Sequence, residues 1–340
     1  MTTLKHRTIP VFIPELACPF RCIYCNQHVI SGQQQMPSDQ EILSTIESHL
    51  ATFPADAHVE LGFFGGTFTG LDLQEQKRLL KLVSPYVKSG SVSSIRLSTR
   101  PDYMSEEIIE TLVEGGVKTV ELGVQSMNQD VLDKVHRGYG VEKVLEAASL
   151  IRQAGLELGM QMMIGLPGDS PEKCLSTAKA IVGAGAKNTR IYPTLVVRQT
   201  ALAAMYERGL YHPLTIEEAV EWTAPVLRHF EENNVTVLRV GLHPTEGFIN
   251  GTDYLAGPFH VSFKELVMTE IFNRQFKEWI SSQSPQKDKE LLLQVNPSKV
   301  NAAIGYHTRN RSMLRQYFKE VRFESNPTLK NYQFIPTLLG

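Results

Sequence analysis

The sequence predicts an α/β fold built on a parallel β-sheet. Short runs of apolar and β-branched residues alternate with longer segments that have the apolar periodicity of amphipathic helices. Successive strand-like runs begin 25 to 51 residues apart, a spacing typical of parallel strands joined by crossover helices. The pattern fits a doubly wound sheet and a barrel equally well. The predicted strands are Thr8–Ile13, Val59–Phe64, Ser94–Ser98, Thr119–Val124, Leu158–Ile164, Thr189–Tyr192 and Val235–Val240.

Capping residues mark where the intervening helices begin and end. In a capping box, Ser or Thr is followed three residues later by Glu, and the two residues satisfy the first free N–H groups of a helix. Ser38–Glu41 and Thr215–Glu218 have this pattern. Further signals predict helices that begin near Ser105, Val141 and Ser170–Pro171, and helix ends at Gly115–Gly116 and Gly155.

After about residue 251 the alternation ends, and a smaller α+β module is predicted. We therefore divide the chain into residues 1–250 and residues 251–340. The polar segment Ser281–Lys289 predicts an exposed loop, because it contains Pro285 and no apolar periodicity. The rest of the module predicts a strand at Leu291–Val295, short helices around Lys299 and Leu314, and a hairpin near Val321–Phe334.

The composition excludes several classes of protein. The chain has 340 residues, 42% of them hydrophobic, and a formal net charge of −2, which suits a folded protein without overall attraction to nucleic acid. No run approaches the roughly 18 apolar residues of a membrane span, and prolines interrupt the short apolar run Ile9–Pro14. We therefore expect no membrane association and a cytoplasmic location. Residues 264–340 carry 12 Lys and Arg against 7 Asp and Glu. This basic module predicts either contact with phosphates or an ordinary solvated surface.

Three of the four cysteines lie close together. Cys18, Cys22 and Cys25 have the spacing C-x3-C-x2-C, whereas Cys174 stands alone. A [4Fe–4S] cluster normally takes four thiolates. Three thiolates from one loop leave one iron open to a small molecule that carries an amine and a carboxylate, such as S-adenosylmethionine. The alternatives are a disulfide, unrelated buried cysteines, or a structural zinc site completed by His6 or His28.

The cysteine run, with Tyr24 as the aromatic residue before its last cysteine, resembles the signature of the radical S-adenosylmethionine (radical SAM) superfamily. A longer series of motifs resembles the radical domain of the elongator catalytic subunit, which modifies wobble uridines of tRNA. It is similar, more loosely, to oxygen-independent coproporphyrinogen oxidases. The resemblance implies a partial (β/α)6-type TIM-like barrel. The motifs are Ser98–Asp102, Glu121–Ser126, Arg137–Gly138, Met162–Gly168 and Pro193–Arg198.

The resemblance also implies roles for individual residues. Cys18, Cys22 and Cys25 would ligate the [4Fe–4S] cluster, Tyr24 would pack near the adenine of S-adenosylmethionine, and Arg137 would pair with its methionine carboxylate. Thr67 stands where the superfamily has an acidic residue after two glycines. The full set of residues assigned to the cofactor is Tyr24, Gly65, Gly66, Thr67, Ser98, Gln125, Arg137, Gly165 and Leu166.

By the same resemblance, the chain is an enzyme that cleaves S-adenosylmethionine reductively to a 5′-deoxyadenosyl radical, which abstracts hydrogen from the substrate. The electron would come from a flavodoxin- or ferredoxin-like reductant, and the substrate would be tRNA, bound through the basic C-terminal module. Elongator catalytic subunits also carry an acetyltransferase-like domain, which the residues after Gly251 do not resemble. The alternatives are a small-molecule substrate, as in the porphyrin-related branch, and a non-catalytic zinc or Fe–S protein.

Three further residues are candidates for handling a hydrogen atom or a proton. Cys174 would quench a substrate radical or, alternatively, fill the core as a small hydrophobic residue. His243 follows the last predicted strand and His260 lies in a Gly-Pro-Phe-His loop, so either histidine would transfer a proton or serve a structural role.

Overall fold

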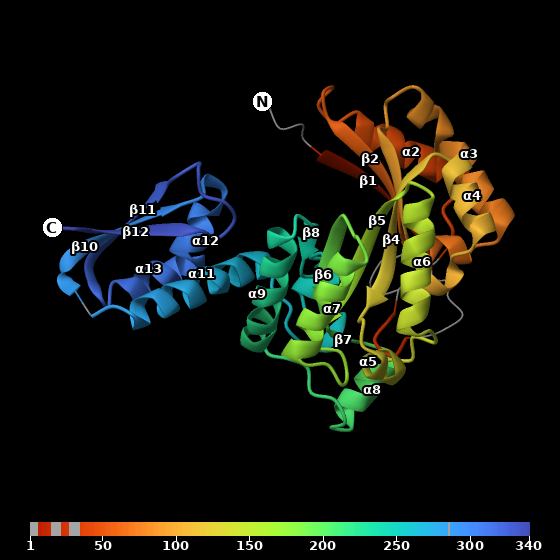
Figure 1. Ribbon diagram of the computed structural model, residues 1–340. Helices are drawn as coiled ribbons and strands as arrows, with labels where there is room; N and C mark the ends of the chain where they lie inside the picture. Colours follow the sequence, from red (N-terminus) through yellow and green to blue (C-terminus); the bar gives the residue numbers. More distant parts are fainter. Residues whose placement is uncertain (1–5, 15–21, 27–34, 285) are drawn as a thin grey trace.

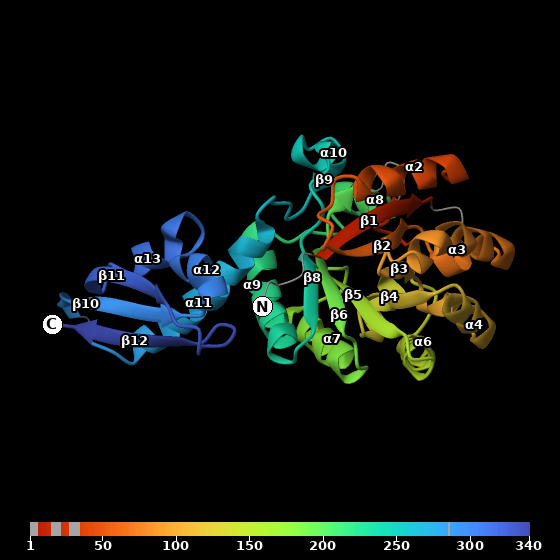
Figure 2. The ribbon, with the colours of Figure 1, turned by 90° about the horizontal axis from the view of Figure 1, so that it is seen from above.

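The computed structural model describes residues 6–14, 22–26, 35–284 and 286–340. Its main element is a seven-stranded sheet in which all neighbouring strands are parallel. The sheet curls into a half-barrel with β1 and β8 at its two edges, which confirms the partial-barrel prediction (Figures 1 and 2). The strands follow the predicted runs closely. In spatial order they are β1 (His6–Ile13), β2 (His58–Gly65), β3 (Ser94–Thr99), β4 (Val117–Gln125), β5 (Glu157–Ile164), β6 (Asn188–Pro193) and β8 (Thr236–Val240).

Helices cover the convex side of this sheet (Figure 2). Both capping boxes are present: Ser38 accepts a hydrogen bond from the backbone N–H of Glu41, and Thr215 accepts one from that of Glu218. The predicted starts at Ser105 and Ser170 are confirmed by side-chain caps at the same residues. The main helices are α2 (Asp39–Leu50), α3 (Leu73–Lys88), α4 (Glu106–Glu114), α6 (Val141–Gln153), α7 (Pro171–Gly183) and α9 (Ile216–Glu232).

Side chains alternate between the two faces of the sheet along each strand. On β4, Val120, Leu122 and Val124 are buried in the core, whereas Glu121 and Gln125 line a cavity on the concave face. Parallel sheets usually bury apolar side chains on both faces. The polar concave face of this sheet is therefore the face that is built to receive a ligand.

The C-terminal module differs from its prediction in two places. Strand β10 begins at Gln286, so the second half of the predicted loop Ser281–Lys289 is part of a strand. The predicted hairpin near Val321–Phe334 is wrong, because β10 (Gln286–Val295) lies between β11 (Phe318–Ser325) and β12 (Phe334–Leu339). The physical reason is burial: Leu291, Leu293 and Val295 are fully buried and make β10 the most buried strand of the module, and the central position covers it on both sides.

Helix α11 (Phe263–Ser281) was not apparent from the sequence. It packs against α9 of the half-barrel and against α12 (Val300–Ile304) and α13 (Arg309–Leu314) of the module, which are the two predicted short helices. Figure 1 shows it joining the two parts of the molecule. Asn273 lies on its buried face and donates a hydrogen bond to Asn310 Oδ1 at 2.9 Å, and such buried polar residues interrupt the apolar periodicity. No helix in the described ranges is long and apolar enough to cross a membrane.

Candidate functional site

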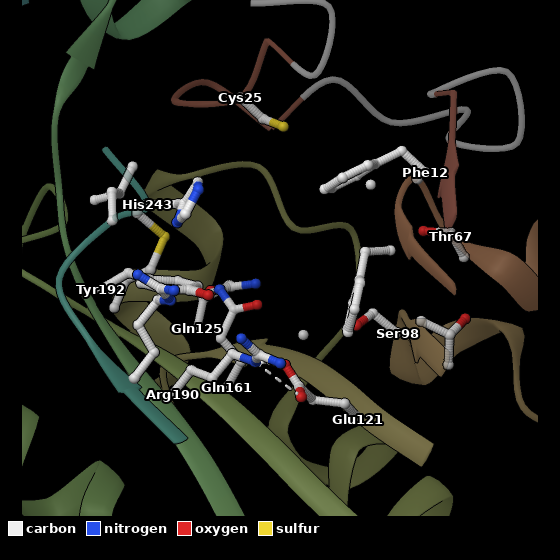
Figure 3. A pocket seen from close by; sticks show the side chains of 18 of the residues that line it. Phe12, Cys25, Thr67, Ser98, Glu121, Gln125, Gln161, Arg190, Tyr192 and His243 are labelled. Atoms are coloured by element: carbon white, nitrogen blue, oxygen red, sulfur yellow. Dashed lines mark hydrogen bonds and ion pairs between the residues drawn. The ribbon is translucent and has the colours of Figure 1, made fainter. Parts of the chain in front are cut away.

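The concave face of the half-barrel encloses a cavity of about 840 Å³. This volume lies within the range of about 300–1,000 Å³ that is usual for small-molecule sites. Residues from all seven strands contribute to its lining. In Figure 3, Cys25 lies at the top of the cavity, with Thr67 and Ser98 on one side and His243, Tyr192 and Arg190 on the opposite side.

The cysteine loop lies at one end of this cavity. Cys22 and Cys25 both line the cavity, and Cys25 N donates to Cys22 O at 3.0 Å, which turns the chain between them. Leu202 N, at the start of α8 (Ala201–Glu207), donates to Ile23 O at 2.7 Å and holds the loop from outside. Cys18 lies outside the described residues.

Two guanidinium groups surround the sulfur of Cys22. Arg137 Nη1 donates to Cys22 Sγ at 3.1 Å, and Arg100 Nη1 approaches the same sulfur at 3.6 Å. Asp102 holds Arg100 through two hydrogen bonds of 2.8 and 2.9 Å. The two cations offset negative charge at this sulfur, which suits a thiolate that ligates an anionic cluster.

Arg137 is buried, and all five of its N–H groups have partners within the protein. Nε and Nη2 donate to the hydroxyl of Tyr139, Nη2 also donates to the carbonyl of Gly123, and Nη1 donates to Cys22 and to the Tyr24 hydroxyl. Burial alone would lower the pKa of Arg137, but the neighbouring Tyr139, Tyr24 and Cys22 raise it well above the usual range. Arg137 therefore lies against the cysteine loop, and its role toward a cofactor carboxylate stays a prediction.

Tyr24 is buried between this guanidinium and an apolar cluster. Burial raises the pKa of the Tyr24 phenol well above its usual value, so the ring stays neutral. Leu166 belongs to the same cluster as Tyr24, and Gly165 O accepts a hydrogen bond from the Tyr211 hydroxyl at 2.7 Å. Gly165 and Leu166 therefore belong to the apolar surroundings of the cysteine loop. Neither is among the residues that line the cavity.

Gly65, Gly66 and Thr67 line the cavity where β2 ends beside β1. Gly66 N donates to Ile13 O, at the end of β1, at 2.8 Å. Gly65 has a φ of +98°, and a Cβ at this position would lie 2.4 Å from Ile13 O. A side chain is excluded here both by the backbone conformation and by the close approach of the two strands.

Gly65→Ala is therefore expected to be more destabilising than the same change at Gly90, which has a φ of +79° but no atom within 4 Å of an added Cβ. The difference in the free energy of unfolding should be about 1–3 kcal/mol, because only Gly65 adds a backbone clash to the strained φ. Urea denaturation of the two variants measures this difference. If both variants lose the same free energy of unfolding, the close approach of Ile13 O does not require glycine at position 65.

Gln125 ends β4 in an unusual conformation. Its φ is +71°, and the pairing of β4 with β5 shifts register between Gly123 and Gln125. This bulge directs the amide into the cavity, where Gln161 Nε2 donates to Gln125 Oε1 at 3.1 Å. Ser98 lies across the cavity at the end of β3 (Figure 3). Both residues therefore lie on the wall of the cavity, and their role toward a cofactor stays a prediction.

Sequence reasoning missed a network of buried charges on the floor of the cavity. Arg96 Nε lies 2.7 Å from Glu60 Oε2, and Arg96 Nη1 lies 3.2 Å from Glu121 Oε2. Arg190 Nε is 2.8 Å from Glu121 Oε1 and 3.0 Å from Oε2. The sequence did contain a signal that could have revealed this network. Charged residues occupy alternate positions of the predicted parallel strands, where apolar residues are usual.

Of the three residues predicted to handle a hydrogen atom or a proton, only His243 lines the cavity. His243 lines the cavity, and burial together with Arg239 lowers its pKa, so the imidazole is neutral at pH 7. His260 is not among the lining residues; its Nδ1 accepts a hydrogen bond from Ser262 N at 3.0 Å at the start of α11. Cys174 lies on the buried face of α7, is not among the residues that line the cavity, and donates its thiol hydrogen to Asp169 Oδ2 at 3.0 Å.

The described residues fit a thiolate-ligated cluster with an adjacent nucleoside cofactor. Cys22 and Cys25 present soft sulfur ligands at one end of the cavity, which suit iron–sulfur chemistry. Gly65 and Gly66 line the same cavity and carry no side chain that would fill it. The remaining volume and its polar walls are of the size and kind that hold a small charged molecule.

Comparison with known proteins gives a consistent result. The family model of the Radical SAM superfamily matches residues 13–181, and the Radical_SAM C-terminal domain matches residues 186–273. The tRNA uridine(34) acetyltransferase of Dehalococcoides mccartyi is 29% identical over 240 residues, which are 60% of this chain and 52% of that protein. Elongator complex protein 3 of Saccharomyces cerevisiae is 30% identical over 169 residues, 49% of this chain and 28% of that protein. The chain thus spans about half or less of the length of these relatives.

Among solved structures, the Elp3 of the archaeon Methanocaldococcus infernus has the same fold. It superposes with a TM-score of 0.62 at 24% identity and covers 83% of this chain and 65% of its own. The two proteins therefore agree in the arrangement of their strands as well as in their sequence motifs. Members of the radical SAM superfamily are enzymes that typically use S-adenosylmethionine and a [4Fe–4S] cluster, and this chain belongs to that superfamily.

Proposed function

We propose that the protein is a radical SAM enzyme that acts on tRNA. Cys18, Cys22 and Cys25 hold a [4Fe–4S] cluster, and S-adenosylmethionine binds beside it in the half-barrel. When bound, the two supply a 5′-deoxyadenosyl radical that abstracts hydrogen from the substrate. A flavodoxin- or ferredoxin-like protein supplies the electron. The proposal uses the tRNA chemistry of the relatives and leaves the transferred group open.

One observation carries the proposal. Cys22 and Cys25 open onto the same cavity as seven residues that the resemblance assigns to the cofactor, although most of these come from separate parts of the chain. A disulfide or a structural zinc site requires no such cavity. The seven residues are Tyr24, Gly65, Gly66, Thr67, Ser98, Gln125 and Arg137.

The protein's own groups have defined tasks in this proposal. Arg100 and Arg137 offset the charge at Cys22, and the bulge at Gln125 presents an amide to polar atoms of the cofactor. Tyr24, held by Arg137, closes the cavity behind the cysteine loop and excludes water from it. The neutral imidazole of His243 faces the cavity and can accept a proton there.

The tRNA substrate is supported by the names of relatives and by the basic C-terminal module. Part of that positive charge is internally paired, because Arg309, Arg315 and Arg322 form ion pairs with glutamates. These arginines remain more than half exposed, so they can still approach phosphates. Binding of tRNA to the basic module should therefore weaken steeply as salt concentration rises.

Nucleosides of bulk tRNA test the substrate directly. Cells without the gene are expected to lack, or to contain less of, one modified nucleoside, as measured by mass spectrometry. The gene restored with wild-type sequence should recover that nucleoside, and the gene carrying Cys22→Ala should not. An unchanged nucleoside profile would contradict the tRNA proposal and indicate a small-molecule substrate.

A further inference from the structure

The cavity has two sides, and the cofactor residues occupy only one of them. The cavity-lining residues that the resemblance assigns to S-adenosylmethionine lie in the cysteine loop, at or just after the ends of β2, β3 and β4, and, in the case of Arg137, after α5 (Gln129–Lys134). The opposite side, formed by β6, β8 and the segment that follows β8, carries none of them. Figure 3 shows Tyr192, Arg190 and His243 gathered on that side. These side chains are available to a second molecule, which in a radical enzyme is the substrate.

Two arginines stand next to each other on this side. Arg190 of β6 is the register partner of Arg239 of β8, because the pairing shifts by one residue after Thr189. The shift brings both guanidinium groups to the cavity, where both line its wall. Like charges at directly paired positions of neighbouring strands are destabilising. An anionic ligand bound beside the two guanidinium groups would offset this repulsion.

Only one of the two cations has a carboxylate partner. Arg190 is held by both oxygens of Glu121, and its guanidinium lies 5.3 Å from the ring centroid of Phe64. Among residues 6–14, 22–26, 35–284 and 286–340, no hydrogen-bond or ion-pair partner of the Arg239 guanidinium is present. Arg239 is therefore a cation inside a ligand-sized cavity whose charge the described protein does not neutralise.

The surroundings of Arg239 suit a polar group attached to a larger molecule. The pKa of His243 is lowered by burial and by Arg239, so it adds no competing positive charge at pH 7. Leu242 and Phe248 line the same cavity and belong to one apolar cluster. At the two edges of the half-barrel, Phe12 of β1 and Leu238 of β8 line the cavity and are also exposed to solvent. The cavity thus opens laterally, which admits one unit of a polymer.

We propose that Arg239 is the anion-binding residue of a substrate subsite and that it receives a phosphate group of the nucleic-acid substrate. The inference rests on the proposed function, since it takes the β6–β8 side of the cavity as the substrate side. It adds to that function a specificity-determining residue outside the superfamily motifs. Arg190 is already paired with Glu121 of β4 and does not compete for the phosphate.

Binding of mononucleotides to the anaerobically reconstituted full-length protein tests the subsite. Uridine 5′-monophosphate and uridine are titrated up to millimolar concentration and followed by NMR. We expect the wild-type protein to bind the monophosphate at least tenfold more tightly than uridine, because a charge-assisted hydrogen bond is typically worth about a factor of ten or more. Arg239→Gln should remove this preference, and Arg239→Lys should restore part of it.

Arg228→Gln is the matched control, because Arg228 pairs with Glu232 on the exposed surface of α9. It should bind both ligands as the wild type does. Equal affinity of wild type and Arg239→Gln for the monophosphate would overturn the inference, as would a wild-type protein that does not discriminate between the two ligands. A loss of S-adenosylmethionine affinity in Arg239→Gln would assign Arg239 to the cofactor instead. Iron content and S-adenosylmethionine cleavage, measured on the same samples, report separately on the proposed function.

Discussion

Cys22→Ala is expected to leave the reconstituted protein without its iron–sulfur cluster. The wild-type protein should hold about four irons per chain. Removal of Cys22 leaves two thiolates of the three-cysteine loop, too few to hold a cluster whose fourth iron binds the cofactor. Cys22 is also the buried ligand on which the Arg100 and Arg137 side chains converge. Iron analysis and the visible absorption of the cluster measure the loss.

Cys174→Ser is the matched control for this change. Cys174 lies in the core, is not among the residues that line the cavity, and a serine hydroxyl can replace its thiol as the donor to Asp169. The control should retain the iron content of the wild type. Full iron in Cys22→Ala, or loss of iron in Cys174→Ser alone, would contradict the assignment of the cluster to the N-terminal loop.

Glu121→Gln is expected to lower the free energy of unfolding by about 3 kcal/mol. Glu121 is buried and is the carboxylate that pairs with Arg190 and, at 3.2 Å, with Arg96. Removing one partner of a buried ion pair typically costs about 3–5 kcal/mol, because the remaining charge is left without compensation. The loss should be seen as a lower denaturant midpoint of the half-barrel in urea.

The exposed pair on α9 supplies the comparison for Glu121. Glu232 lies 2.7 Å from Arg228, and both side chains are nearly half exposed. Glu232→Gln should change the free energy of unfolding by less than about 1 kcal/mol, because water already screens the pair. Similar small losses in both variants would show that water reaches the cavity floor and that the charges there are not buried in solution.

The strands and helices of the half-barrel could be predicted from local sequence because their signals are local, whereas the curling of the sheet into a half-barrel was implied only by the resemblance. Each strand is a short apolar run, and helix starts such as Ser38 and Thr215 carry their own caps. The C-terminal module was harder, because its strand order depends on which strand is most buried. The apolar residues of β10 demand a central position, and this requirement cannot be read from the turn-like segment between β11 and β12.

The cysteine side of the cavity could be recognised from sequence, whereas the pair of arginines on the opposite side could not. Cys22, Cys25 and Tyr24 lie within four residues, so their spacing is visible in the chain. Arg190 and Arg239 lie 49 positions apart and meet only through a register shift between β6 and β8. The alternation of side chains along a strand, read from the sequence, does not reveal a register shift between two strands. Contacts of this kind appear only when the strands are paired in three dimensions.

Release of 5′-deoxyadenosine tests the central claim most directly. The anaerobically reconstituted protein is incubated with S-adenosylmethionine and a strong reductant, and the nucleoside is quantified by liquid chromatography with mass spectrometry. We predict 5′-deoxyadenosine in the wild-type reaction and none above background when Cys18, Cys22 and Cys25 are replaced by alanine. A protein that binds one zinc and no iron, or an intact cluster that never yields 5′-deoxyadenosine, would contradict the assignment of this chain as a radical SAM enzyme.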